Sequence, residues 1–310
     1  MKRALILSGG GSFGAFEVGA IDYLIQKAGL DFDTFLGTSV GALNVSFLGQ
    51  AQNAAELKEY AAKLRDFWMG IPGYQAIYKQ SIIGKFILIF RDYLYKPNGL
   101  KKIIRQKIDF QKLCGNPAKN VKIAVVELET GEIVMADNQC KQFAEDFPDY
   151  ILASSSMPLY FPGVWINSKR CYDGGLRDIT PLGKIFEENP DEIVIVTTYP
   201  VKTDFSPRFK IEKPLGTLKV LLRTIDIFAN EIGANDLKVA NFICEQLEYS
   251  PKQGEVTIQL ITPEEPLPGN DSLEFEPHRI RELFNMGRHA AQKPRIIKYP
   301  CELQSKKISG

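Results

Sequence analysis

The sequence predicts an α/β fold with a mainly parallel central sheet, and three observations support this class. Short apolar runs at residues 3–7 and 34–37 alternate with helix-forming segments at residues 15–27 and 41–50, which is the order of a parallel α/β sheet. Both strands end in a glycine-containing turn that leads directly into a helix. A further apolar strand follows much later, at residues 192–198, so the sheet draws on distant parts of the chain.

The other elements follow in chain order. Residues 53–113 are mostly helix-forming, and we expect a helical insertion or lid beside the sheet. Alternating segments at 121–128 and 133–136 flank a Glu-Thr-Gly-Glu turn and predict a hairpin. Further predicted elements are a helix at 142–153, an irregular stretch at 158–175, a helix around 218–228, a strand at 256–261 and a last helix at 277–292. We expect one domain over residues 1–295 and a C-terminal tail over residues 296–310.

Composition and charge limit the function classes. The 310 residues include 38 Lys and Arg against 37 Asp and Glu, a formal net charge of +1, and 45% are hydrophobic. Such a chain can bury a large core, but it lacks the basic surplus that binding to a nucleic-acid backbone requires. Its five cysteines are widely spaced and never form a C-x-x-C pair, which fits neither a disulfide framework nor a zinc site and favours a reducing compartment.

Export and membrane insertion are not expected from the sequence. Only four apolar residues, 4–7, follow the basic N-terminus, against the roughly 7–15 of a signal peptide. The apolar run at residues 86–90 is far shorter than the ~18 residues that span a bilayer. We therefore expect a cytoplasmic protein, at most peripheral to a membrane, with no cleavable signal peptide and no transmembrane helix.

The first glycine-rich turn has two interpretations. Gly9, Gly11 and Gly14 satisfy G-x-G-x-x-G between a predicted strand and a predicted helix, which is the context of a dinucleotide-binding fingerprint. A Rossmann-type NAD(P) oxidoreductase also needs an acidic residue at the C-terminal end of the second strand to hold the ribose. Asp31 and Asp33 have about the right sequence distance, but they precede that strand and lie at its wrong end. The alternative is that the loop serves a neighbouring site.

That neighbouring site is the second turn. Gly37, Ser39 and Gly41 match G-x-S-x-G between a strand and a helix, where a sharp turn exposes the serine hydroxyl and the glycines avoid steric clashes. Because the carboxyl ends of parallel strands meet at one edge of a sheet, we expect the glycine-loop amides and Ser39 to face one cavity. The loop could then stabilise the oxyanion that forms when Ser39 attacks a carbonyl group.

A nucleophilic serine needs a base, and the chain offers two kinds. Its histidines, His278 and His289, follow Ser39 and Asp173 in the order of an α/β-hydrolase triad, but both lie on a predicted amphipathic helix beside arginines. Asp173 precedes two glycines, where an unusual turn and a close backbone approach are allowed. A carboxylate is a stronger base where water is excluded, so a dyad of Ser39 and Asp173 is also workable.

Together the glycine loop at residues 9–14, the G-x-S-x-G motif and the Asp173-Gly174-Gly175 sequence resemble the patatin-like phospholipase family. The run Ala-Ser-Ser-Ser-Met-Pro at residues 153–158 is similar to the segment that precedes the Asp-Gly-Gly motif in that family. The resemblance extends over residues 2–198 and loosely beyond. It implies a three-layer α/β/α fold and hydrolysis of fatty-acyl esters of membrane lipids, of the phospholipase A or lysophospholipase type, without a metal or cofactor.

The resemblance also implies residue roles. Ser39 would be the nucleophile and Asp173 the base of a Ser-Asp dyad. The amides of Gly9, Gly10, Gly11 and Gly14 would form the oxyanion hole, and Gly37, Gly41, Gly174 and Gly175 would support the motifs. In one position the chain departs from the family pattern. The family usually has a basic residue just before the last glycine of the loop, where this chain has Phe13, so a cation that could help hold an anionic head group is missing.

A lipid substrate at a membrane surface requires an apolar contact region. Residues 82–95 are rich in aromatic side chains and resemble an interfacial helix, so we expect peripheral membrane contact through Phe86, Phe90 and Tyr93. A cap helix packed on the core is the alternative for this segment. For the whole chain, a catalytically silent lipid-binding protein is a third functional class, against which the presence of both Ser39 and Asp173 argues.

Overall fold

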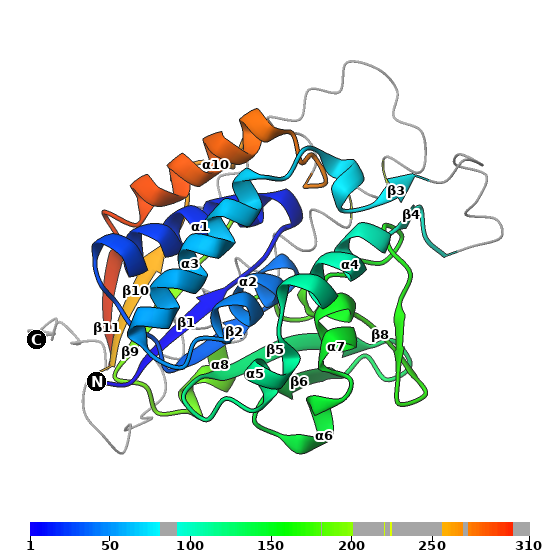
Figure 1. Ribbon diagram of the computed structural model, residues 1–310, viewed down its shortest axis with the longest axis horizontal. Helices are drawn as coiled ribbons and strands as arrows, with labels where there is room; N and C mark the ends of the chain where they lie inside the picture. The colour runs from blue at the N-terminus through cyan, green and yellow to red at the C-terminus, as the bar shows by residue number, and fades with distance from the viewer. Residues whose placement is uncertain are drawn as a thin grey trace, which may run out of the picture.

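The computed structural model describes residues 1–80, 92–180, 182–200, 220, 224, 256–268 and 272–299. Phe86, Phe90 and nearly all of the predicted helix around residues 218–228 lie outside these ranges. Within them, the main sheet has the strand order β11-β10-β9-β1-β2-β5-β8-β7, with β6 paired to β5 (Figure 1). The strands are β1 Arg3–Leu7, β2 Thr34–Gly37, β5 Asn120–Glu127, β6 Ile133–Asp137, β7 Val164–Ile166, β8 Lys169–Asp173, β9 Glu192–Val196, β10 Val256–Ile261 and β11 Arg295–Tyr299. A separate ribbon pairs β3 (Lys79–Gln80) with β4 (Tyr95–Lys96).

The helices fall mostly where the apolar periodicity predicts them. They are α1 Gly14–Ile21, α2 Val40–Leu48, α3 Ala54–Met69, α4 Asn98–Lys107, α5 Phe110–Cys114, α6 Lys141–Ala144, α7 Phe147–Ser154, α8 Leu182–Phe186 and α10 Pro277–Ala290. A π-helical turn, Asp22–Lys27, continues α1, so the helix expected at 15–27 is present. The side chain of Asn53 caps α3 by accepting hydrogen bonds from the N–H groups of Ala55 and Glu56, each at 3.0 Å.

The predicted mainly parallel sheet is confirmed. The strands from β10 through β9, β1 and β2 to β5 pair in parallel. Among the described strands of this sheet, antiparallel pairs occur toward the two edges, where β11 joins β10, β6 and β8 join β5, and β7 joins β8. Every residue of β9 is buried, as are the last four of β1. Strands buried on both faces read as continuous apolar runs, which explains why these segments lack the alternation of a half-exposed strand.

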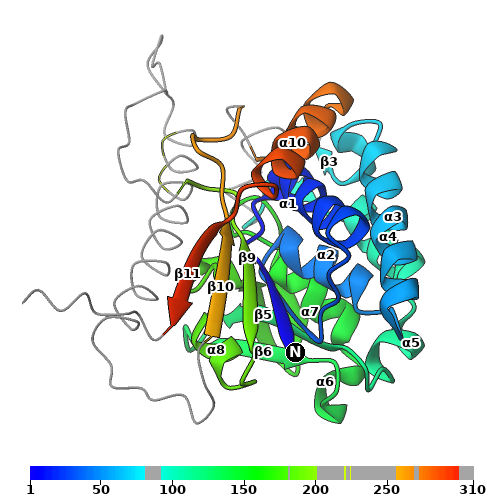
Figure 2. The ribbon, with the colours of Figure 1, turned by 90° about the vertical axis from the view of Figure 1, so that its left-hand side faces the viewer.

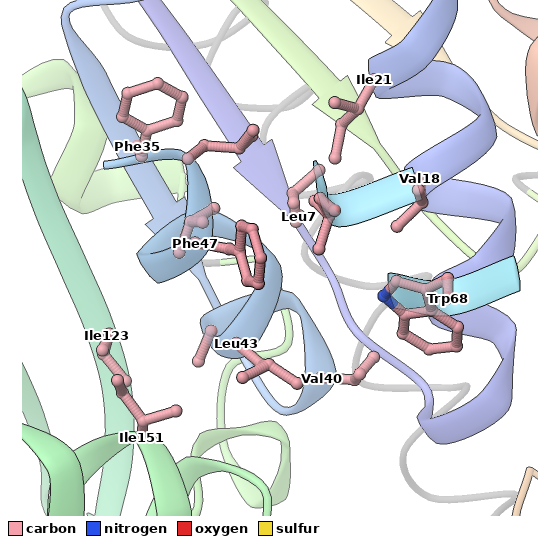
Figure 3. Packing of buried hydrophobic residues seen from close by; sticks show 14 of the residues in the cluster. Leu7, Val18, Ile21, Phe35, Val40, Leu43, Phe47, Trp68, Ile123 and Ile151 are labelled. Carbon is pink, nitrogen blue, oxygen red and sulfur yellow. The ribbon is translucent and has the colours of Figure 1, made fainter. Parts of the chain in front are cut away.

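Helices cover both faces of this sheet, as expected for three layers. Helices α1, α2, α3, α7 and α10 lie on one face, and α8 lies on the other (Figure 2). Consecutive residues of β1 divide between these layers. Leu5 and Leu7 pack into the larger core under α1 and α2, and Ala4 and Ile6 pack against the apolar side chains of α8. Figure 3 shows the larger core, where Leu7, Val18, Leu43 and Trp68 bring together β1, α1, α2 and α3.

The insertion expected at residues 53–113 is helical in its described parts, with α3, α4, α5 and the β3–β4 ribbon. It is also part of the main fold rather than an appendage. In α3, Leu57, Ala61, Leu64 and Trp68 recur at helical spacing, and all four are buried in the larger core. Residues 81–91, which hold most of the aromatic segment, lie outside the described residues.

Three sequence expectations require correction. The helix expected at 142–153 is two helices, α6 and α7, because Pro148 occupies the first turn of α7 and cannot continue a preceding helix. The stretch expected to be irregular up to residue 175 contains the β7–β8 hairpin, whose turn places Asn167 and Ser168 at φ values of 48° and 63°. Residues 296–299, which were expected to belong to the tail, are part of β11 and pair with β10.

The register of β5 decides where the chain segments meet. Gly37, the last residue of β2, pairs with Ile123, whereas β5 continues to Glu127. Strand β2 pairs with residues 120–123 of β5, and β6 pairs with residues 122–126. Because these stretches overlap, β6 must occupy the opposite edge of β5 from β2. Beyond the end of β2, the vacated edge is taken by β8, with Asp173 opposite Val125. The end of β8 therefore lies directly above the turn that follows β2.

Candidate active site

Ser39 occupies the sharp turn between β2 and α2. Its φ of 56° and ψ of −132° lie outside the regions that L-residues normally adopt, and it is the residue that precedes α2. Such strained geometry in a non-glycine residue is typical of functional sites, where the surrounding structure compensates for a cost of about 1–3 kcal/mol. The side chain is half-buried and makes no capping hydrogen bond to α2, so its hydroxyl is not committed to the helix. The turn has the geometry expected for an exposed nucleophile.

The end of α7 holds the backbone of Ser39 on both sides. The Ser154 hydroxyl accepts a hydrogen bond from the Ser39 N–H at 3.0 Å, and the Ser155 hydroxyl donates to the Ser39 carbonyl at 3.2 Å. The backbone carbonyl of the next residue, Ser156, accepts a hydrogen bond from the Asp173 N–H at 3.2 Å. One short segment therefore contacts the backbone of both candidate dyad residues. Sequence reasoning singled out this serine run only through the family resemblance and gave its members no role.

Asp173 ends β8 and is 1% exposed. Its Oδ1 accepts the Gly175 N–H at 2.8 Å, and its Oδ2 makes no hydrogen bond to any described residue. Burial raises the pKa of this carboxyl to about 7 from 3.8, although the hydrogen bond from Gly175 and the Ser39 side chain both act to lower it. A carboxylate with a pKa near neutrality can both accept and return a proton in a reaction cycle. The structure thus brings Ser39 and Asp173 together, as expected.

The glycine loop supplies fewer free donors than expected. The Gly9 N–H is bonded to the buried Glu17 carboxylate at 2.6 Å, and the Gly14 N–H points back to the carbonyls of Gly11 and Ser12. Among the described residues, no acceptor binds the N–H groups of Gly10 and Gly11. These two amides therefore remain as candidate oxyanion donors, and the expectation for Gly9 and Gly14 is corrected: both amides are used within the fold.

The remaining motif glycines allow close backbone packing. A Cβ atom at Gly37, Gly41 or Gly174 would lie 2.5–2.6 Å from a backbone oxygen of Gly41, Leu7 or Ala124, respectively. A Cβ at Gly14 would lie 2.7 Å from the side chain of Val40 and 2.9 Å from that of Trp68. Gly175 differs from these, since its main contribution is the N–H donated to Asp173. Gly14, Gly37, Gly41 and Gly174 are thus required by close packing around the turn, and at Gly175 a Cβ atom would lie 3.1 Å from Asp173 Oδ1.

An apolar cavity of about 50 Å³ opens beside Ser39. Its lining also includes Gly11, Ser155 and a set of apolar side chains, among them Val40, Leu43, Trp68, Phe161, Leu273 and Phe275. These come from α2, α3, the segment after α7 and the segment before α10. A wall of this composition favours a hydrocarbon chain over a polar ligand.

The two alternative chemistries are not supported by the geometry. His278 and His289 are exposed on α10, neither lines the cavity, and neither is among the groups that shift the pKa of Asp173. For a dinucleotide, the acidic residues are at the wrong edge, because Asp33 accepts the N–H of Arg3 at the beginning of β1. The Ser12 N–H, at the helix start where a pyrophosphate would bind, is already bonded to the Ser272 carbonyl at 2.6 Å.

Phe13, which stands where the family usually has a basic residue, is covered by a cation from another element. The Arg279 guanidinium of α10 lies 5.4 Å from the centre of the Phe13 ring and pairs with Glu274. Arg279 is buried, so this contact joins the glycine loop to the start of α10.

Within the described residues, no cluster of His, Cys, Asp and Glu could hold a metal ion. In the same ranges, no helix is both long and apolar enough to cross a bilayer. Of the three aromatic residues expected to contact a membrane, only Tyr93 is described. Tyr93 is half-buried, and its backbone forms an isolated parallel β-bridge with Leu159.

The family assignment follows from comparison with known proteins. A family model described as patatin-like phospholipase matches residues 5–184, which include the glycine loop, Ser39 and Asp173. The chain belongs to the patatin-like phospholipase family. This patatin-like protein therefore has the fold of a family of lipid hydrolases, with the sheet and layers described above.

Individual relatives are distant. The uncharacterized protein YjjU of Escherichia coli (strain K12) is 24% identical over 295 residues, which cover 93% of this patatin-like chain and 75% of YjjU. Among solved structures, VipD from Legionella pneumophila is similar with a TM-score of 0.44 and 12% identity, over 96% of this chain and 68% of VipD. The type III effector ExoU of Pseudomonas aeruginosa has a TM-score of 0.37 and 12% identity, over 97% of this chain and 56% of ExoU. The patatin-like chain thus spans little more than half the length of ExoU.

Proposed function

We propose that this protein is a serine lipid acyl hydrolase of the phospholipase A or lysophospholipase type, which cleaves fatty-acyl esters of membrane lipids through a dyad of Ser39 and Asp173. The observation that carries the proposal is the pairing of the strained, half-buried Ser39 with a buried carboxylate whose pKa is raised to about 7. Membership in the patatin-like phospholipase family and the apolar cavity beside Ser39 support a lipid substrate.

The first half of the reaction forms an acyl-enzyme. Ser39 Oγ attacks the ester carbonyl carbon while Asp173 Oδ2, which has no other hydrogen-bond partner among the described residues, accepts the hydroxyl proton. The carbonyl oxygen becomes an oxyanion, which the N–H groups of Gly10 and Gly11 stabilise. The intermediate then collapses: the bond to the alcohol oxygen breaks, Asp173 returns the proton to that oxygen, and the alcohol leaves.

The second half repeats these steps with water. Asp173 accepts a proton from a water molecule as its oxygen attacks the acyl carbon, and the same amides hold the second oxyanion. Collapse of this intermediate releases the fatty acid, and the proton returns to Ser39. Because Asp173 starts and ends each half-reaction ionised, its raised pKa serves both proton transfers.

The apolar cavity accounts for substrate choice. An acyl chain next to the scissile ester can lie along the side chains of Leu43, Phe161 and Phe275, with its carbonyl group at Ser39 and Gly11. The lipid would be drawn from a membrane surface by peripheral contact, for which Phe86 and Phe90 remain candidates outside the described residues. No metal or organic cofactor is required by this scheme.

The proposal is tested by comparing the wild-type protein with Ser39→Ala and Asp173→Asn. Hydrolysis of a short-chain chromogenic ester and of phosphatidylcholine vesicles is measured, together with covalent labelling by a fluorophosphonate probe. We expect both activities and labelling in the wild-type protein, no labelling of Ser39→Ala, and a loss of at least about 1000-fold in the kcat of Asp173→Asn. His278→Ala and His289→Ala serve as controls and should retain full activity.

Two outcomes would contradict the proposal. A folded wild-type protein that binds vesicles but neither hydrolyses esters nor reacts with the probe would be a lipid-binding protein. Retention of wild-type activity in Ser39→Ala, with circular dichroism showing the same fold, would place the nucleophile elsewhere.

A further inference from the structure

Glu17, in the first turn of α1, is a fully buried carboxyl that the proposed reaction does not use. Its Oε1 accepts the Gly9 N–H at 2.6 Å, and its Oε2 accepts the side-chain amide of Asn44 at 2.9 Å. Asn44 in turn accepts the indole N–H of Trp68 on its Oδ1 at 3.0 Å. A continuous hydrogen-bonded chain therefore runs from α3 through α2 to the glycine loop.

This series of hydrogen bonds ends at Gly9, which lies against Ser39, the candidate nucleophile. A Cβ atom at Gly9 would lie 2.3 Å from the Thr38 carbonyl oxygen and 2.7 Å from the Ser39 Cβ. The Gly9 carbonyl is held as well, because the Thr198 hydroxyl donates to it at 2.5 Å. A trans peptide unit is planar, so fixing the Gly9 carbonyl also fixes the direction of the Gly10 N–H. The two anchors on Gly9 thus determine where one candidate oxyanion donor points.

The placement of a carboxyl here is costly and needs an explanation. Burial raises the pKa of Glu17 to about 8 from 4.5, and the hydrogen bonds from Gly9 and Asn44 offset only part of that effect. An apolar side chain would avoid this cost but would leave the Gly9 N–H and the Asn44 amide buried without acceptors. Each oxygen of Glu17 accepts one hydrogen bond, which the ionised carboxylate can do, whereas a carboxamide or a protonated carboxyl carries hydrogen at one of the two positions. The arrangement is therefore complete above pH 8, where Glu17 is ionised, and the variants below are compared there.

We propose that Glu17 is a positioning residue for the oxyanion hole: together with the Thr198 hydroxyl it holds Gly9 against Ser39, and so sets the orientation of the Gly10 amide. This inference rests on the proposed ester hydrolysis. It assigns a role to a residue that touches neither the substrate nor the reacting atoms, and it explains why the Gly9 amide is absent from the oxyanion hole.

The inference can be tested by changing which groups donate and which accept in the hydrogen-bonded series Gly9, Glu17, Asn44 and Trp68. In Glu17→Gln, the new NH2 group faces either the Asn44 NH2 or the Gly9 N–H, and rotating Asn44 only moves the conflict to the Trp68 N–H. In the double variant Glu17→Gln/Asn44→Asp, the carboxamide introduced on α1 accepts from Gly9 and donates to the carboxylate introduced on α2, which still accepts from Trp68. The double variant therefore restores every hydrogen bond with the same total charge. Ser46→Ala is the matched control, since Ser46 is equally buried on α2 but bonds only to Ala42 of its own helix.

The kinetic constants on a short-chain ester distinguish positioning from stability. We expect Glu17→Gln to lower kcat about 10- to 100-fold with little change in KM, the double variant to recover most of that loss, and Ser46→Ala to match the wild type. Fluorophosphonate labelling of Ser39 should slow and recover in parallel. The inference is overturned if folded Glu17→Gln has wild-type kcat, or if the folded double variant is as slow as the single one. A wild-type protein inert to both ester and probe would instead refute the proposed function, and this inference with it.

Discussion

The hydroxyl of Ser154 accepts the backbone N–H of Ser39 across 115 residues of sequence, at a distance of 3.0 Å. Ser39 adopts a strained backbone conformation, and its amide precedes the first turn of α2. A side chain from α7, rather than α2 itself, therefore satisfies this N–H and helps to keep the turn in its strained form.

Removing this contact should slow catalysis more than it disturbs the fold. In Ser154→Ala, the Ser39 N–H loses its acceptor, which costs about 1–3 kcal/mol and allows the turn to relax. We expect kcat on a short-chain ester to fall about tenfold or more, with KM nearly unchanged. Ser156→Ala is the control, because that hydroxyl bonds only to Leu152 within α7. Equal losses in both variants would show that the serine run is merely structural.

The rate of hydrolysis should depend on pH through Asp173. The base must be ionised to accept the Ser39 proton, and the pKa of this carboxyl is raised to about 7. We therefore expect kcat/KM to rise tenfold per pH unit below about 7 and to level off above it. The measurement is a pH profile between 5 and 9 with a neutral ester. A rise centred near pH 4, the value of an ordinary carboxyl, would contradict the role given to the burial of Asp173.

The same carboxyl should make stability depend on pH in the opposite direction. Well below pH 3.8, Asp173 is protonated in both the folded and the unfolded chain. Between 3.8 and about 7 the unfolded chain loses this proton first, so stability falls as the pH rises, and the full penalty of roughly 4 kcal/mol is present above pH 7. Asp173→Asn lacks this penalty.

The difference in free energy of unfolding between Asp173→Asn and the wild type should thus be small at pH 4 and grow until about pH 7. Urea titrations of both proteins at several pH values measure it, and the other titrating groups cancel in the difference. If this difference in the free energy of unfolding stayed constant over the range, the pKa of Asp173 would be the same in the folded and the unfolded chain, and burial would not raise it.

The strain at Ser39 should appear in a comparison of two inactive variants. Glycine adopts a φ of 56° without steric cost, whereas alanine keeps the Cβ atom. Relief of about 1–3 kcal/mol of strain is partly offset by the greater entropy of glycine in the unfolded chain, about 0.5–1 kcal/mol. We expect Ser39→Gly to be about 1 kcal/mol more stable than Ser39→Ala in urea titrations. The reverse order would indicate that the turn is unstrained.

The sequence predicted the central strands and the two glycine-containing turns because their signals are local. The apolar runs of β1, β2 and β9 and the glycine patterns next to Ser39 each lie within a few residues. The β7–β8 hairpin was missed because its strands are short and lie among prolines, although Asn167 is a residue that tolerates the left-handed conformation of its turn. The role of β11 as a strand depends on pairing with β10, a tertiary contact that no local pattern encodes.

The candidate site was predicted in part for the same reason. Ser39 and Asp173 could be selected from motif and chemistry, but the hydrogen-bond state of each glycine amide could not. Whether the Gly9 N–H is free depends on Glu17, which in the sequence is one acidic residue at the start of a helix. Its complete burial follows from the packing of α1 against α2 and α10, and a carboxyl on an otherwise apolar helix face was the signal available.

The pairing of β8 with the free edge of β5 brings Asp173 to Ser39 from a distant part of the sequence. Ser39 and Asp173 are separated by 134 positions, but their relative placement depends on two short stretches of backbone pairing, at Ile123 and at Val125, on a single strand. Changes of length in the exposed turns between these elements leave both residues in place, as long as the register of β5 is kept. A one-residue slip there would instead turn Asp173 to the opposite face of the sheet. Turns can therefore vary around the cavity while Ser39 and Asp173 keep their relative placement.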